Sequence, residues 1–257
     1  MSVETAVEAP ARPRLRWWRE VAIIVVFYGV YSLVRNQFGS AGSPVAAHRE
    51  AFQHARDVIR IERAVGLFHE ESIQQWFLGW RSFIQFWNLF YGTFHFVVTA
   101  GCLVWLFRRF PERYVRWRTT LAVTTALALF GFALFPLLPP RLLPEHYGFV
   151  DTLQSYGGLW SFDSGAMSKV SNQYAAMPSL HFAWSTWCAL VLVPTVKRTW
   201  VRVLAACYPL LTVFAIVVTA NHYWIDAAGG AVILGLGSLA GLLWANRARV
   251  AEVLVET

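Results

Sequence analysis

Charged residues are scarce in this 257-residue chain, at 14% of the sequence against about a quarter in an ordinary soluble domain. This argues against a water-exposed enzyme, a disordered tail and a nucleic-acid-binding protein, although the formal net charge is +7. Cysteine is sparse as well: all three residues lie inside apolar runs, without the spacing of a disulfide framework or a zinc site. Internal repeats and low-complexity tracts are also lacking. What the chain has in abundance is apolar sequence, which points to a single membrane domain.

Six apolar runs follow one another, and most are near the roughly 20 residues that cross a bilayer. They cover residues 21–34, 82–107, 119–138, 179–196, 200–220 and 226–245. We therefore expect an all-α, polytopic integral membrane protein built as a six-transmembrane-helix bundle. The predicted organisation is a cytoplasmic basic segment over 1–20, a membrane domain over 21–245 and a cytoplasmic tail over 246–257.

The first run is short and follows four arginines, so a signal peptide is an alternative to a membrane anchor. An uncleaved anchor is favoured because no clear A-x-A cleavage site follows the run.

Basic residues indicate the orientation, because cytoplasmic segments of membrane proteins are enriched in Lys and Arg. With the N-terminus inside, the inner segments hold 14 of the 22 basic residues and a net charge of +8, whereas the outer segments carry −1. The sequence thus predicts a protein of the cytoplasmic membrane with both termini inside.

Two of the predicted outer segments are long enough to have a structure or function of their own. Between Val45 and Trp80, charges alternate at roughly helical spacing with Ala55, Val58, Ile59, Ile61, Val65 and Leu67. This pattern suits an amphipathic helix lying on the membrane or over the bundle, with a solvated connector as the alternative. The second segment, Pro139 to Pro178, is about 40 residues long, and a loop of that length is usually functional or disordered.

Ionisable groups at the ends of membrane helices are costly to desolvate and therefore suggest function. Arg141 follows the third run, His181 opens the fourth, and His222 and Asp226 lie between the fifth and sixth. The topology puts all four on the outer side, so the active site is expected to be extracytoplasmic.

Each of these residues also has a purely structural alternative. Arg141 could be an interfacial anchor, His181 could bond to a helix end, and the His222–Asp226 pair could join two helices. Their convergence favours a phosphoryl-transfer site with a nucleophile, an orienting carboxylate, an acid and a charge clamp.

The local sequence supports a phosphate site. Ser179 is expected to cap the helix that carries His181, leaving backbone N–H groups that favour an anion. At positions i and i+4, Asp226 can accept the N–H of the His222 ring and fix its tautomer. Arg141 follows two prolines and can contact a phosphate through two nitrogens.

Pro-Ser-Leu-His at 178–181, followed by His-x-x-x-Asp at 222–226 and preceded by Arg141, resembles the type 2 phosphatidic acid phosphatase superfamily. The surrounding residues 174–181, Pro139-Pro140-Arg141 and His222-Tyr223 are more similar to its inositol-phosphorylceramide-synthase-like branch of inositolphosphotransferases. The resemblance implies that His222 attacks phosphorus, Asp226 orients it, His181 protonates the leaving oxygen and Arg141 binds the phosphoryl oxygens.

Two cations of the family pattern are missing here, since the corresponding positions are Leu134 and Ile216. A site with fewer cations suits a phosphodiester better than a monoester, unless Lys169 or the outer helix supplies the charge. We therefore expect a lipid phosphotransferase or phosphoesterase whose acceptor, headgroup and oligomeric state stay open. A lipid phosphate or polyprenyl pyrophosphate phosphatase is the alternative within the family, and a transporter or flippase, or a structural membrane subunit, outside it.

No cofactor or metal is required by this chemistry, and the expected partners are a membrane lipid and the bilayer. Gln85, Asn88, Tyr91 and His95 form a polar stripe on the second apolar run. The stripe could bond to neighbouring helices or contribute to the polar end of the substrate site. The glycines between 229 and 241 are expected to form a close-packing face.

Overall fold

The protein is helical throughout the part of the chain that the structure describes, which is residues 15–37, 44–157 and 173–256. In these residues the structure, a computed structural model, contains nine α-helices, two short 3-10 helices and no strand. The one β-type pairing among them is an isolated parallel bridge between Leu137 and Ala175. The predicted all-α class is confirmed.

Five helices in the described residues are long and apolar enough to cross a membrane. They are α1 (Trp17–Gln37), α4 (Arg81–Arg109), α5 (Pro111–Leu134), α8 (Thr199–Val218) and α9 (Trp224–Glu256). They correspond to five of the six predicted spans, although α1 begins four residues earlier than expected and is 21 residues long.

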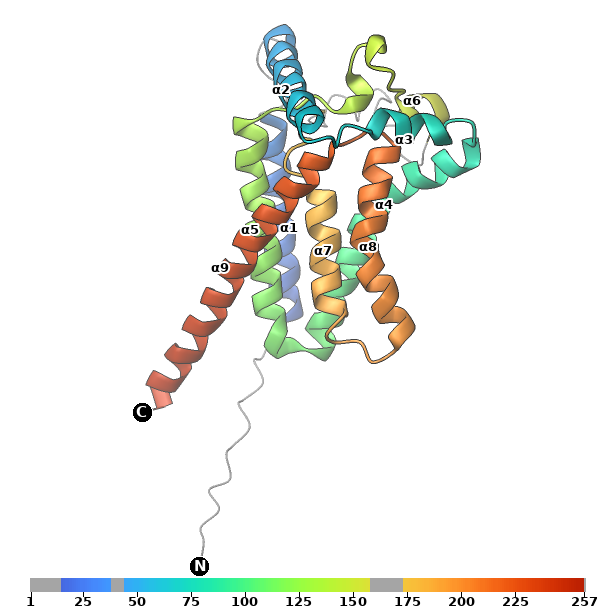
Figure 1. Ribbon diagram of the computed structural model, residues 1–257. Helices are drawn as coiled ribbons and strands as arrows, with labels where there is room; N and C mark the ends of the chain where they lie inside the picture. The colour runs from blue at the N-terminus through green and yellow to red at the C-terminus, as the bar shows by residue number, and fades with distance from the viewer. Residues whose placement is uncertain (1–14, 38–43, 158–172, 257) are drawn as a thin grey trace, which may run out of the picture.

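The run over 179–196 is shorter as a helix than predicted. Its helix, α7 (Leu180–Leu192), has 13 residues, or about 20 Å, against a hydrocarbon core of about 30 Å. Figure 1 shows α7 in the middle of the bundle, and it packs against α4, α5, α8 and α9. Because protein rather than lipid surrounds it, the backbone groups at its ends can find partners without reaching both membrane surfaces.

Helix α9 runs obliquely along the bundle and packs most extensively against α5 (Figure 1). Side chains at Gly237 and Gly241 would collide with Thr124 and Thr120 of α5, so the two backbones approach closely there. Gly229 and Gly230 lie against the Pro178–Ser179 segment, whereas Gly235 has no neighbour within 4 Å. The predicted close-packing face therefore exists, without Gly235.

The outer elements cover one end of the bundle. They are α2 (Pro44–Ala64), α3 (Glu70–Phe77), the 3-10 helices η1 (Pro140–Leu142) and η2 (Glu145–Tyr147), and α6 (Thr152–Tyr156). Ala55, Val58 and Ile59 of α2 are buried against Leu137, Leu138 and Tyr223, which confirms an amphipathic helix lying over the bundle. Ile61, Val65 and Leu67, which the sequence counted among the apolar positions of this helix, are exposed instead. Ile61 lies outside the buried stripe of α2, and Val65 and Leu67 follow the end of the helix at Ala64.

The opposite end of the bundle carries the start of α1 and the end of α9 (Figure 1). Helix α1 packs on α5, where the largely buried carboxylate of Glu20 pairs with Arg118. The 108–118 and 197–202 connections, which are rich in Arg and Lys, join their helices at this same end. The fold thus separates a basic end from the end that the outer helices cover.

Candidate active site

His222 lies in the tight turn between α8 and α9. Helix α8 ends at Val218 and is followed by Ala220 in the left-handed region at φ 54°. The N–H groups of Asn221 and His222 both donate to the carbonyl oxygen of Ile216. This turn fixes the backbone of His222 to the end of α8. Asp226, in contrast, belongs to the first turn of α9.

The two side chains meet across this junction. Nδ1 of His222 lies 3.1 Å from Oδ2 of Asp226, which also accepts the N–H of Tyr223 at 3.0 Å. Both side chains are buried. Because Asp226 engages Nδ1, the ring nitrogen that can attack a substrate is Nε2, and the carboxylate stabilises the positive ring that such an attack produces.

His181 comes from the start of α7, as the sequence predicted. Ser179 is the N-cap, and its hydroxyl accepts the N–H of Phe182 at 3.4 Å. The N–H of Ser179 donates to the Asp226 carbonyl oxygen at 2.9 Å, and a Cβ at Gly230 would lie 2.5 Å from the Ser179 carbonyl oxygen. The start of α7 is therefore held directly against the first turns of α9, which brings His181 toward His222.

Four aromatic rings gather at this point. The centroids of His181 and His222 are 5.4 Å apart. Tyr91 of α4 stacks on His181 at 4.2 Å with an interplanar angle of 21°, and His95 lies edge-on to His181 at 4.2 Å. Tyr91 and His95 thus cover the imidazole of His181 on the side that faces α4.

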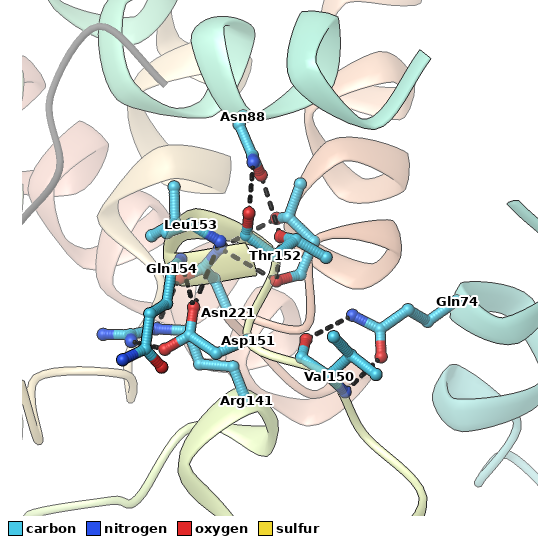
Figure 2. Close-up of polar contacts among 10 residues, drawn as sticks. Gln74, Asn88, Arg141, Val150, Asp151, Thr152, Leu153, Gln154 and Asn221 are labelled. Atoms are coloured by element: carbon cyan, nitrogen blue, oxygen red, sulfur yellow. Dashed lines mark hydrogen bonds and ion pairs between the residues drawn. The ribbon is translucent and has the colours of Figure 1, made fainter. Parts of the chain in front are cut away.

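Arg141 reaches the same site from η1 and is held on three sides. Its backbone N–H donates to the Ala220 carbonyl oxygen at 2.8 Å, Nε donates to Asn221 Oδ1 at 3.1 Å, and Nη1 donates to Asp151 Oδ2 at 2.6 Å. Figure 2 shows Asp151 and Asn221 beside the guanidinium group. The side chains of Arg141 and Asp151 are 7% and 12% exposed, so solvent screens this ion pair little.

The segment that carries Asp151 is fastened to the bundle (Figure 2). Oδ1 of Asp151 caps α6 by accepting two backbone N–H groups, and Gln74 of α3 pairs through its amide with both backbone groups of Val150. Asn88 of α4 donates to the carbonyl oxygens of Thr152 and Gly157 and accepts the Thr152 hydroxyl. These bonds hold the carboxylate of Asp151 in place beside Arg141.

A cavity of about 170 Å³ joins these groups. Its polar lining includes Arg141, Asn221, His181 and His222, and its aromatic lining includes Tyr28 and Tyr31 of α1, Phe96 of α4 and Trp184 of α7. A phosphate group attached to an apolar chain matches a cavity of this kind. Arg141 is the one Lys or Arg among the lining residues that the structure describes.

The structure brings together His181, His222, Asp226 and Arg141, the four residues predicted from separate chain segments. The four residues of the polar stripe on α4 have two different roles. Gln85 and Asn88 donate hydrogen bonds to backbone carbonyl oxygens of residues 152–157, whereas Tyr91 and His95 line the cavity. Lys169 lies outside the described residues.

Asp151 and Asn221 are the site residues that the sequence did not predict. Asp151 precedes Thr-Leu-Gln in the pattern of a helix N-cap, which was a signal for α6 but not for a partner of Arg141. For both residues the contact with Arg141 depends on the tertiary fold.

The arrangement is suited to nucleophilic substitution at phosphorus. In such a reaction the nucleophile would be His222, oriented by Asp226, the proton donor would be His181 beside it, and the fixed positive charge would be that of Arg141. Among the described residues, no group of three or more His, Cys, Asp or Glu side chains could hold a metal ion.

Comparison with protein families gives a match over most of the chain. The family model described as the PAP2 superfamily matches residues 56–240, which contain the second half of α2, His181, His222, Asp226 and Arg141, and the first half of α9. Searches of curated proteins and of solved structures gave no match.

Proposed function

This chain belongs to the PAP2 superfamily of phosphatases and phosphotransferases, and we propose that it acts on a membrane lipid phosphodiester through a phosphohistidine at His222. Family membership and the five apolar helices make it a membrane enzyme of lipid phosphate chemistry. The choice of a phosphodiester donor, with inositolphosphotransferase as the branch, is our proposal.

The observation that carries this choice is the ion pair between Arg141 and Asp151. Among the described residues that line the cavity, Arg141 is the one Lys or Arg. The largely buried carboxylate of Asp151 already offsets its positive charge. The two family positions that would hold further cations are Leu134 and Ile216, so neither supplies a second positive charge. A phosphodiester brings one negative charge and a monoester nearly two at neutral pH, so the diester is the better match.

The reaction proceeds in two balanced steps. In the first, Nε2 of His222 forms a bond to phosphorus, the bond from phosphorus to the leaving alkoxide breaks, and His181 gives that alkoxide its proton. In the second, an acceptor hydroxyl gives its proton to His181 and attacks phosphorus, and the bond to His222 breaks. An alcohol as acceptor makes the enzyme a transferase, and water makes it a phosphoesterase.

The decisive experiment uses the purified full-length protein and a panel of lipid phosphodiesters, phosphomonoesters and pyrophosphates, with mass spectrometry of every product. We expect diesters to be turned over fastest. His222→Ala should abolish turnover, whereas the exposed His146→Ala should behave as wild type. A strong preference for monoesters or pyrophosphates would contradict the proposal and leave a lipid phosphatase.

A second measurement separates the roles of the two histidines. An activated aryl phosphodiester has a leaving group that needs no proton, so His181→Ala should still load His222 with phosphorus. Intact-protein mass spectrometry should detect that adduct in His181→Ala and not in His222→Ala. Equal failure of both variants would contradict the assignment of His181 as the acid.

We further propose that the covered end of the bundle faces the extracytoplasmic side of the cytoplasmic membrane. The basic connections at the opposite end support this orientation through the positive-inside rule. In a Cys207→Ser background, an impermeant thiol reagent applied to intact cells should label Ser155→Cys and leave Lys197→Cys unlabelled. The reverse pattern would invert the orientation.

A further inference from the structure

Two glutamates of the outer helices reach the first turn of α9. Oε1 of Glu62, near the end of α2, accepts the N–H of Ile225 at 2.9 Å, and Oε1 of Glu70, at the start of α3, accepts the N–H of Trp224 at 3.3 Å. Glu62 is 1% exposed and Glu70 is fully buried. Glutamate is almost never buried to this extent without a partner, so these contacts must offset a large desolvation cost.

The N–H groups that they bind have no acceptor inside the helix, because they belong to its first turn. The preceding N–H, that of Tyr223, is taken by Asp226. Three carboxyl groups therefore hold three consecutive backbone N–H groups between His222 and Asp226. Any shift of this turn relative to the end of α8 changes the 3.1 Å contact between His222 and Asp226.

The two glutamates also face each other. Their second oxygens, the Oε2 atoms, are buried without a donor when both groups are ionised, and the side chains are close enough for a hydrogen bond when one is protonated. Burial, followed by the neighbouring Glu70, raises the pKa of Glu62 to about 9. Asp226 of α9 and Tyr223 are titratable groups that also interact with this pair. Burial raises the pKa of Tyr223 well above its ordinary value.

At neutral pH Glu62 therefore keeps its proton. Its ionisation would add a buried anion beside Glu70 and Asp226.

We propose that Glu62 and Glu70 form a carboxyl clamp that holds the first turn of α9 and thereby positions the His222–Asp226 pair for attack. The inference rests on the proposed role of His222 as the nucleophile. Neither glutamate lines the cavity, so both are positioning residues that act through the backbone of α9. The outer helices α2 and α3 thereby take part in the alignment of the reacting groups.

The test removes the titration of Glu62 with Glu62→Gln. Glutamine can accept the Ile225 N–H through its oxygen and donate to Glu70 through its nitrogen, but it cannot ionise. The ratio of kcat for Glu62→Gln to kcat for wild type should be near one at pH 7 and rise to about tenfold at pH 10. Because other titrating groups are common to both proteins, they cancel in this ratio. Glu50→Gln, on the exposed face of the same helix, is the matched control and should give a ratio near one throughout.

A second variant tests the clamp itself. The double substitution Glu62→Ala and Glu70→Ala should lower kcat at pH 7 by at least tenfold with KM within about twofold, since the cavity contacts remain. Thermal melting identifies the preparation as folded. If this variant does not fold, the Glu62→Gln ratio alone decides.

Two results would overturn the inference: a Glu62→Gln ratio that stays flat from pH 7 to 10, or a folded double variant with wild-type kcat. These outcomes are distinct from failure of the proposed function. Retained turnover in His222→Ala refutes the nucleophile, whereas an inactive His222→Ala with a flat Glu62→Gln ratio refutes the clamp only.

Discussion

Replacing Asp151 with asparagine should change which phosphate esters the enzyme prefers. The substitution is nearly isosteric, and asparagine is as good a helix N-cap as aspartate, so the cap of α6 is kept. It removes the carboxylate that lies 2.6 Å from Nη1 of Arg141. The remaining effect is electrostatic: the guanidinium charge is no longer offset.

The size of the effect follows from the geometry. A phosphoryl oxygen that shares the guanidinium with Asp151 lies roughly 5 Å from that carboxylate, and at an effective dielectric constant of about 20 each charge is repelled by about 3 kcal/mol. A monoester carries nearly one more negative charge than a diester. If half or more of the repulsion is realised, the monoester gains about 1.5 to 3 kcal/mol relative to the diester, or about 10- to 100-fold.

The assay compares kcat/KM for a phosphatidic-acid-like monoester and for a diester with the same acyl chains, in wild type and Asp151→Asn. The monoester-to-diester ratio should rise by the stated factor. Asp57→Asn, which removes an exposed carboxylate of α2, should leave the ratio unchanged. An unchanged ratio in Asp151→Asn, or a shift toward diesters, would refute the charge-matching argument.

Three further substitutions test how the site is built. Arg141→Lys should lose most of the activity in the product assay, because an ammonium cannot bond to Asn221 and a phosphate in the fixed geometry of a guanidinium; wild-type kcat/KM would contradict that role. Gly230→Ala should lower the melting temperature and kcat, since its methyl group would press on the Ser179 carbonyl oxygen, whereas Gly235→Ala, with open space around it, should not. Asn88→Ala should destabilise the protein by about 1 to 3 kcal/mol, because it leaves buried carbonyl oxygens unpaired; an unchanged thermal melt would show that these bonds are replaced by others.

The membrane-spanning fold was largely predictable because apolar runs of about 20 residues are rare outside helices that cross a bilayer. The exception is α7, for which the length of the apolar run did not predict the length of the helix. Hydrophobicity predicts that a segment avoids water, but it does not distinguish a helix surrounded by lipid from one surrounded by other helices. The run over 179–196 is of the second kind, and its helix ends at Leu192.

The residues that we propose as reacting groups stand out in the sequence because they occur in short motifs at helix ends. His181, His222, Asp226 and Arg141 stand out as polar residues next to apolar runs, and family resemblance gives them roles. Asp151 and the two clamp glutamates do not stand out in this way. They occur among other polar residues of the outer segments, where solvent exposure is the usual outcome, and only tertiary contacts show that they are buried.

The division between bundle and outer cover has a consequence for how the enzyme can change. The histidines are presented by α7 and by the α8–α9 junction, whereas Arg141, its carboxylate partner Asp151 and the cavity-lining residues Pro139 and Leu153 come from residues 137–157. Substitutions in that stretch can alter the shape and charge offered to a headgroup while the ring-to-ring geometry of the histidines stays in place. Donor choice is therefore a separately tunable trait in this architecture, and libraries restricted to residues 137–157 are the place to begin directed evolution of a new headgroup preference.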